Sequence, residues 1–395
     1  MIVKGSGHFV LDGRFNLTHA ILETPSIYKN QLLQNSKNNA NHKNYDPIID
    51  WKQPSPSTIE KTIESRVKPL RTLTSPIFFS TGLDGKRRKG LGFVPSHNHK
   101  SGVDGIEEKK KPLLFVANHQ LLGLDLGMII AQLIEERGMN ARGLAHPIIF
   151  QAGDGFGGGF GPGDDSGNDS RIERRDRDGR IKDSNAKAGG TFEEFGAVMV
   201  SPKNYYRLME TGQIGLLFPG GVREVFHGKD EAYELFWPEK VDFVRVAARF
   251  NATIVPISAV GAADSANILV DAPDMLNLPF GLGERAANNT KNVISARYDT
   301  MDSEELFQPP LVVPKPLPSR HYFIFGKPFD TTPIDHKNKE VCAKLYNDVK
   351  FELKRGLNDL LVAKENDPFK NTAQRLAYER VYGKQAPTFS LDDLN

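Results

Sequence analysis

The sequence predicts an α/β domain with a mainly parallel sheet flanked by helices. Several short runs are apolar at every position, which is typical of strands buried on both faces of a sheet. Segments with apolar residues at helical spacing lie between these runs, and this alternation indicates parallel strands joined by helical crossovers. The chain has 395 residues, of which 39% are hydrophobic and 25% charged, so it is long enough to bury a large core.

The first predicted strand is the run PLLFVAN at 112–118, and a helix follows over 124–137, with Gly138 placed to end it. A second buried strand, IGLLFPGG at 214–221, ends in a glycine turn, and a third, TIVPISAVG, spans 253–261. The other predicted elements are a strand over 143–150, a helix over 204–210, a helix over 239–250, a strand over 321–329, and helices over 338–365 and in the 370s.

Changes in composition predict the domain boundaries. Residues 31–58 are rich in Asn, Lys, Ser and Pro, which is typical of a polar linker. Residues 151–190 begin glycine-rich and continue with alternating charges, so we expect a low-complexity insertion at the surface. The main domain is therefore expected over 59–385, followed by a short tail at 386–395.

Charge and cysteine content exclude several classes of protein. Lys and Arg total 51 against 49 for Asp and Glu, and a net charge of +2 gives no field of the kind that binds nucleic acid. The single cysteine, Cys342, cannot form an internal disulfide or a multi-cysteine metal site. No uncharged apolar run approaches the roughly 18 to 20 residues that cross a bilayer, so any membrane contact is expected to be peripheral.

The start of the chain and two basic clusters bear on localisation. The first residues carry neither a secretory signal nor a transit peptide, so we expect a cytosolic protein or a start that is not the native one. The clusters at 86–89 and 109–111 are interpreted either as solvated loops or as contacts to anionic lipid.

The first candidate site is formed by His119 and Asp125, just beyond the strand predicted at 112–118. Ligands of open α/β sheets bind at the carboxyl ends of strands, and a neutral imidazole there can take a proton from a hydroxyl. Six helical steps would leave the two residues about 120° apart, so His119 must precede the helix that holds Asp125. Asp125 can then accept the Nδ1 proton and orient the ring. The alternative is a strand-end histidine and an acid that stabilises a helix N-terminus.

The second candidate site is the turn FPGGVRE at 218–224. Gly220 and Gly221 allow close approach of a ligand to the backbone, and Arg223 offers a planar fork for phosphate or carboxylate. The alternative is a tight turn followed by a surface pair of Arg223 with Glu224.

Three other motifs are not interpreted as catalytic. Gly153, Gly155 and Gly158 match GxGxxG, but more glycine and dense charge follow instead of the helix that receives a pyrophosphate. His146 is interpreted as a structural strand-end residue. His8 lies in a loop typical of a serine-hydrolase histidine, yet the chain has no GxSxG nucleophile elbow, which argues against an esterase.

Several ordered blocks of the sequence resemble the acyltransferase half of the plant and algal phytyl ester synthase family. These proteins are relatives of the diacylglycerol acyltransferases within the lysophospholipid acyltransferase superfamily. The resemblance covers roughly residues 110–280 and extends loosely to HYFIFGKPF and the helices after it. The blocks are LLFVANHQLLGLDLG, RGLAHPIIF, FGAVMVSPKNYYRLM, LLFPGGVRE and YELFWPEKVDFVRVAARFNATIVPISAVG.

The resemblance implies a glycerolipid-acyltransferase-like fold for residues 59–385. Family members usually carry an α/β-hydrolase domain before this half, and residues 5–29 look like its last strand and helix. Residues 1–30 are therefore expected to be a remnant of the hydrolase C-terminus, and His8 its stranded histidine. On this basis the chain resembles a truncated gene product or a shortened paralogue.

The resemblance also implies a function. It predicts transfer of a fatty acyl group from acyl-CoA or acyl-carrier protein to phytol or diacylglycerol, with no metal and no cofactor beyond this co-substrate. By position, His119 and Asp125 correspond to the catalytic motif, although five residues separate them where the wider superfamily has four. The substrate-binding residues implied are Gly220, Gly221, Arg223 and Glu224.

The setting implied by the resemblance is the plastid, at a thylakoid membrane or plastoglobule surface. The alternative is a non-catalytic lipid-binding or scaffold paralogue that has lost its hydrolase domain.

Overall fold

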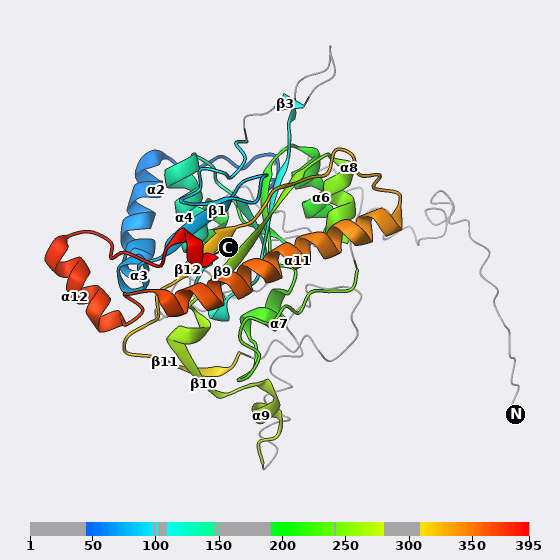
Figure 1. Ribbon diagram of the computed structural model, residues 1–395. Coiled ribbons are helices and arrows are strands. Elements are labelled where there is room, and N and C mark those ends of the chain that lie inside the picture. The colour runs from blue at the N-terminus through cyan, green and yellow to red at the C-terminus, as the bar shows by residue number, and fades with distance from the viewer. Residues whose placement is uncertain are drawn as a thin grey trace, which may run out of the picture.

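The computed structural model describes residues 45–97, 100–101, 109–146, 150, 191–240, 242–279 and 309–394 (Figure 1). The hydrolase remnant with His8, the insertion at 151–190 and the GxGxxG match within it lie outside the described residues. Most of the main domain predicted over 59–385 lies within them.

Among the described residues, nine strands form one sheet. In order across the sheet they are β2 (Arg87–Lys89), β1 (Ile77–Thr81), β12 (Tyr322–Phe325), β9 (Thr253–Val260), β5 (Leu113–Ala117), β8 (Ile214–Leu217), β6 (Arg142–Ala145) and β7 (Val198–Met199), while β13 (Phe329–Asp330) pairs with β9. Two small ribbons lie outside this sheet: β3 (Lys100–Ser101) with β4 (Lys109–Lys110), and β10 (Ala266–Val270) with β11 (Leu311–Pro314).

The sheet is mainly parallel. β5 pairs in parallel with β9 on one side and β8 on the other, and β6 continues the parallel series to β7. β12 joins β9 in the antiparallel direction and pairs in parallel with β1. The predicted fold class, a mainly parallel sheet flanked by helices, is confirmed.

Helices cover both faces of this sheet. The α-helices of the described residues are α2 (Pro56–Thr62), α3 (Lys68–Thr74), α4 (Leu126–Arg137), α5 (Thr191–Glu194), α6 (Pro202–Glu210), α7 (Gly221–Val225), α8 (Asp242–Arg249), α9 (Ala272–Leu276), α11 (Lys339–Ala363) and α12 (Thr372–Tyr382). A π-turn, η1 (Ile63–Val67), joins α2 to α3, and short 3-10 turns occur at η2 (Leu121–Gly123), η6 (Ala263–Ser265), η8 (Lys364–Asn366) and η9 (Leu391–Leu394).

Successive side chains of a strand point to opposite faces of the sheet, and a hydrophobic core lies on each face. Leu114 and Val116 of β5 pack with buried residues of α6, α8 and the long helix α11, which crosses one face of the sheet in Figure 1. Leu113, Phe115 and Ala117 of the same strand pack with α4 on the other face. A strand apolar at every position therefore serves both layers, as the sequence pattern predicts.

The predicted helices and strands recur with shifted ends. Gly138 ends α4 in the left-handed conformation, with φ of 63°, as predicted. The side chain of Ser201 caps α6 by accepting a hydrogen bond from the amide of Asn204. The strand predicted over 321–329 is divided into β12 and β13. The elements β1, α2 and α3 were not predicted from the sequence.

The described end of the predicted linker is packed against the sheet. Ile48 is buried in the core to which α11 also contributes, and Arg142 of β6 donates hydrogen bonds to the carbonyl groups of Pro47 and Ile48. The guanidinium of Arg142 also lies over the ring of Trp51, 4.5 Å from its centroid. Polar composition alone therefore did not identify a segment held by a few buried contacts.

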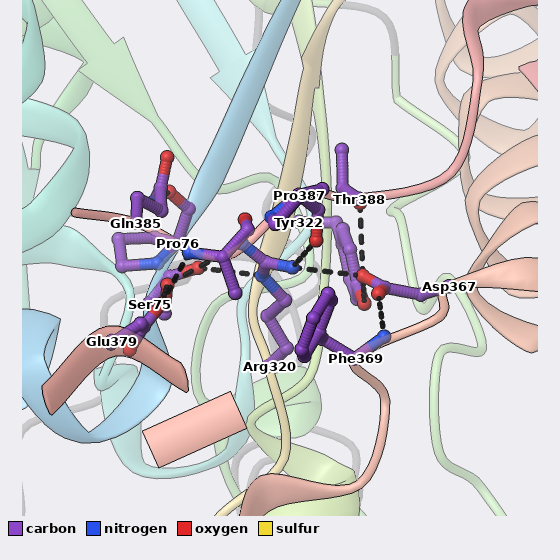
Figure 2. A network of polar contacts seen from close by, with 11 residues as sticks. Ser75, Pro76, Arg320, Tyr322, Asp367, Phe369, Glu379, Gln385, Pro387 and Thr388 are labelled. Carbon is purple, nitrogen blue, oxygen red and sulfur yellow. Dashed lines mark hydrogen bonds and ion pairs between the residues drawn. The ribbon is translucent and has the colours of Figure 1, made fainter. Parts of the chain in front are cut away.

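The predicted tail is likewise held in place by a buried network (Figure 2). Arg320, at the start of β12, forms an ion pair with Asp367 at 3.1 Å and donates to the carbonyl groups of Ala386 and Pro387. Both charged side chains are buried. Asp367 also accepts hydrogen bonds from the hydroxyl groups of Tyr322 and Thr388 and from the amide of Phe369.

We predict that replacing Arg320 with Met lowers the free energy of unfolding by about 3 to 5 kcal/mol, because the carboxylate of Asp367 is left buried without its cation. Urea unfolding monitored by circular dichroism measures this change. The control is Arg355→Met, because Arg355 is 44% exposed in its pair with Glu352, and such pairs contribute roughly 1 kcal/mol or less. A loss below 1 kcal/mol for Arg320→Met would show that the network does not stabilise the fold.

Candidate active site

The backbone around His119 is held by the side chains on either side of it. Asn118 donates from its amide nitrogen to the carbonyl of Ala259 and accepts a hydrogen bond from the amide of the same residue. The side-chain oxygen of Gln120 accepts from the amide of Ala262, at 3.2 Å. Both partners lie at the end of β9, so Asn118 and Gln120 fasten the segment to β9 while His119 points to the other side.

The imidazole of His119 is stacked on a second aromatic ring. Its centroid lies 4.0 Å from that of Phe218, at the end of β8, with an interplanar angle of 20°. A Cβ at Gly123 would lie 3.3 Å from Cε1 of His119, so Gly123 lines the edge of the ring. The side chain of His119 remains 18% exposed, and its Nδ1 atom is buried. The ring is therefore held on two sides and still reaches solvent.

The structure brings His119 and Asp125 together. Asp125 is fully buried at the N-terminus of α4, and its Oδ1 atom lies 4.0 Å from Nδ1 of His119. Between His119 and Asp125, the residues Leu122 and Gly123 adopt left-handed backbone conformations, with φ of 57° and 66°. A left-handed leucine stores strain, and such strain concentrates at functional sites. The predicted pairing through Nδ1 is observed as a close approach that is longer than a hydrogen bond.

Burial disfavours charge on both members of this pair. It lowers the pKa of His119 to about 3 and raises the pKa of Asp125 to about 7. The nearby amides of Gln120 and Leu126 oppose the rise for Asp125, but they do not reach hydrogen-bonding geometry with its oxygens. At neutral pH the imidazole is consequently unprotonated, as a general base must be.

The second motif lies against the first through Glu224. This carboxylate accepts a hydrogen bond from the backbone amide of His119 at 2.7 Å and another from the amide of Phe236 at 3.0 Å. A Cβ at Gly220 would overlap the carboxyl group of Glu224, so glycine is required there. The amide of Gly221 donates to the carbonyl of Phe218 within the turn.

These contacts show what the two glycines do within the turn. The amide of Gly221 donates to the carbonyl of Phe218, and the lack of a side chain at Gly220 leaves room for the carboxylate of Glu224. Contact of Gly220 and Gly221 with a ligand stays a prediction.

Arg223 is paired with Glu231 and not with Glu224, which corrects the ion pair considered from the sequence. Both terminal nitrogens of Arg223 donate to the carboxylate of Glu231, and the guanidinium lies over the ring of Phe236, 3.8 Å from its centroid. Its planar fork is therefore occupied by an acid of the same chain, which opposes the predicted contact with a donor phosphate.

Several contributors to the site were missed by the sequence reasoning. No role was predicted for Phe218 in the turn at 218–224, although an aromatic residue beside a turn at the end of a strand is a signal from which a contributor to the site can be predicted. Asn118 and Gln120 flank His119 and carried no separate signal. Glu231 and Phe236 come from a segment without regular structure, so no periodicity marks them.

Other candidate sites are accounted for by local contacts. His146 follows β6 as predicted, and burial lowers its pKa to about 4. In the basic clusters, Arg87 pairs with Asp359, Lys111 pairs with Asp330, and Arg88 lies over the ring of Phe93. The described ranges contain no group of three His, Cys, Asp or Glu side chains able to hold a metal ion. Within the same ranges, no helix has the length and apolar character needed to span a membrane.

The chain is similar to known proteins over most of its length. No family model matches it. It is 33% identical to phytyl ester synthase 2, chloroplastic, of Arabidopsis thaliana over 357 residues, which are 88% of this chain and 45% of that protein. It is 32% identical to phytyl ester synthase 1, chloroplastic, of the same plant, covering 86% of this chain and 43% of that one. The predicted resemblance is confirmed, and the chain spans less than half the length of either relative.

A solved structure, the 1-acyl-sn-glycerophosphate acyltransferase PlsC from Thermotoga maritima, was also matched. It is 13% identical, with 85% of this chain and 89% of that chain covered and a TM-score of 0.34. At this identity and TM-score, the match gives no support to a role for this chain.

We predict that Asp125→Asn makes the stability of the protein depend on pH. Between about pH 4 and 6.5 the pair holds one proton in both states, on Asp125 when folded and on His119 when unfolded, because the ordinary pKa values are 3.8 and 6.5. Without Asp125, only the unfolded state takes up that proton. The variant should therefore lose about 2 kcal/mol relative to wild type on going from pH 7 to pH 5.

Urea unfolding at the two pH values measures this difference. The control is the double variant His119→Ala with Asp125→Asn, which lacks both groups and should have the pH dependence of the wild type. If Asp125→Asn and the wild type change in parallel, Asp125 does not hold a proton in the folded state at pH 5.

Proposed function

Because this chain is homologous to plant phytyl ester synthases, we propose that it is an acyltransferase that acylates a lipid alcohol. The donor is a thioester, acyl-CoA or acyl-carrier protein, and the acceptor is phytol or diacylglycerol. The observation that carries the proposal is the uncharged His119 beside a buried acid at the carboxyl edge of the sheet. By the same homology, we place the reaction in the plastid.

The proposed reaction is a direct transfer with His119 as general base. The imidazole takes the proton of the acceptor hydroxyl as its oxygen attacks the thioester carbonyl. The carbon to sulphur bond of the tetrahedral intermediate then breaks, and the imidazolium returns the proton to the leaving thiolate. The products are an ester and a free thiol, and no covalent enzyme intermediate or cofactor is required.

Asp125 supports this step through charge. The imidazolium formed during transfer is costly in a buried site, and Asp125 in its ionised form, 4.0 Å from Nδ1, offsets part of that cost. Phe218 presents its ring face to the imidazole, and an aromatic face also favours a cation.

The proposed lipid contact is supported by exposed aliphatic side chains near the site. Leu269 of β10 and Leu311 and Val313 of β11 are between 45% and 55% exposed, and Leu276 and Leu278 at α9 are 40% and 42% exposed. The ribbon and α9 project on the same side of the molecule as α7, which carries part of the second motif (Figure 1). Lys110 and Lys111, by contrast, precede β5 and lie at the opposite edge from its carboxyl end.

We predict that His119→Ala lowers ester formation by about 100- to 10,000-fold, because general base catalysis is lost. The assay follows labelled acyl donor into phytyl ester or triacylglycerol, with circular dichroism and binding to lipid vesicles as controls for folding. Activity retained in this variant contradicts the role of His119. A wild type that binds lipid without turnover identifies the chain as a non-catalytic lipid-binding protein.

We predict that Leu269→Asp combined with Leu311→Asp reduces sedimentation with lipid vesicles at least about 10-fold, because each exposed leucine buried in lipid contributes about 1.5 to 3 kcal/mol. The control is the double variant Val362→Asp with Val381→Asp, whose side chains on α11 and α12 are 67% and 75% exposed, more than those of the two leucines. Equal binding by both variants would show that this ribbon is not the lipid contact.

A further inference from the structure

We propose that Glu224 is a positioning residue for His119, so that the second motif holds the catalytic histidine and does not bind substrate. The proposal rests on the proposed function, in which His119 is the base. Glu224 belongs to α7, which follows β8, whereas His119 follows β5. The contact therefore joins the ends of two neighbouring strands.

Each oxygen of the Glu224 carboxylate accepts a hydrogen bond from a backbone amide. Its Oε2 atom accepts from the amide of His119 at 2.7 Å, and its Oε1 atom accepts from the amide of Phe236 at 3.0 Å. The residue is only 2% exposed. Both distances lie within the range of hydrogen bonds, and bonds to a charged acceptor are about twice as strong as neutral ones. Both oxygens of this carboxylate are therefore used to hold the backbone of the same chain.

Only glutamate satisfies this geometry. Each oxygen receives a different amide, so both ends of the side chain must accept. Glutamine has one accepting oxygen and one donating nitrogen, which would face an amide N–H. Aspartate is one carbon shorter and cannot span both amides from the same position. Gly220 completes the arrangement, because a side chain there would displace the carboxylate.

Glu224 supplies the restraint that the neighbours of His119 lack. In the described part of the chain, the side chains of Asn118 and Gln120 bond to the backbone at the end of β9, whereas the amide of His119 bonds to Glu224 on the side of β8. Phe218, also on the β8 side, contacts only the ring. The amide of His119 is two bonds from its Cβ, so displacement of this amide moves the imidazole relative to Asp125 and to the acceptor hydroxyl.

The test compares Glu224→Gln and Gly220→Ala with the matched control Glu379→Gln. Glu379 also accepts from two donors, the hydroxyl of Ser75 and the amide of Ala386, but through its Oε1 atom alone, and it lies in the network of Figure 2 away from His119. Each variant is assayed below its melting temperature for kcat and for KM of both substrates. In parallel, the protein is labelled with 15N-histidine, and the His119 amide is assigned by its loss in His119→Ala.

Positioning predicts a specific combination of results. Glu224→Gln and Gly220→Ala should lower kcat by about 10- to 100-fold, since a displacement of about 1 Å can cost that much, with KM changed less than about twofold. Their His119 amide signal should move upfield and exchange faster with solvent. Glu379→Gln keeps an oxygen that can accept both of its bonds, so it should change neither kcat nor the His119 amide.

Three results would overturn the proposal. A rise in KM with kcat unchanged would assign Glu224 to substrate binding. A loss of activity that only follows the folded fraction would make its role purely structural. A His119 amide signal that moves in neither Glu224→Gln nor Gly220→Ala would show that the hydrogen bond does not hold the segment. Because the amide signal does not depend on turnover, it decides the contact even if the wild type proves inactive and the proposed function fails.

Discussion

The parallel pairing of β5 with β8 and β9 is the constraint on which the site depends. Strands that run in the same direction end at the same edge, so His119 after β5 and Phe218 after β8 meet there. The end of β9 supplies the backbone groups of Ala259 and Ala262 that hold the segment around His119. Residues about a hundred or more positions apart along the chain are thus brought together by the register of the strands.

The sequence alone predicted those features that depend on residues close to one another along the chain. Runs apolar at every position predicted the central strands, since a strand packed by helices on both faces has no polar side. The closeness of His119 and Asp125 was also predictable, because a strand end and the next helix start are separated by few residues. Their 4.0 Å separation was not, since it depends on left-handed backbone at Leu122, a residue that rarely adopts it.

Features that depend on distant partners could not be read in the same way. Arg223 and Glu224 are adjacent and suggested a pair, yet neighbouring residues of a helix point about 100° apart. Each instead binds a segment beyond α7, at Glu231 and Phe236. β1 was missed for a related reason. Its short apolar run has no predicted helix before it, and its place is set by pairing with β12, far along the chain.

Two buried acids of this fold, Asp367 and Asp125, differ in their hydrogen-bond partners. Asp367 is surrounded by donors from Arg320, Tyr322, Thr388 and Phe369, and a buried charge satisfied in this way holds its neighbours in one arrangement. In the part of the chain that the structure describes, neither oxygen of Asp125 has a hydrogen-bond partner. Burial raises the pKa of Asp125, whose carboxyl group lies 4.0 Å from Nδ1 of His119. Asp367 thus holds its neighbours in one arrangement, whereas Asp125 faces a titratable ring at the edge of the sheet where β5 ends.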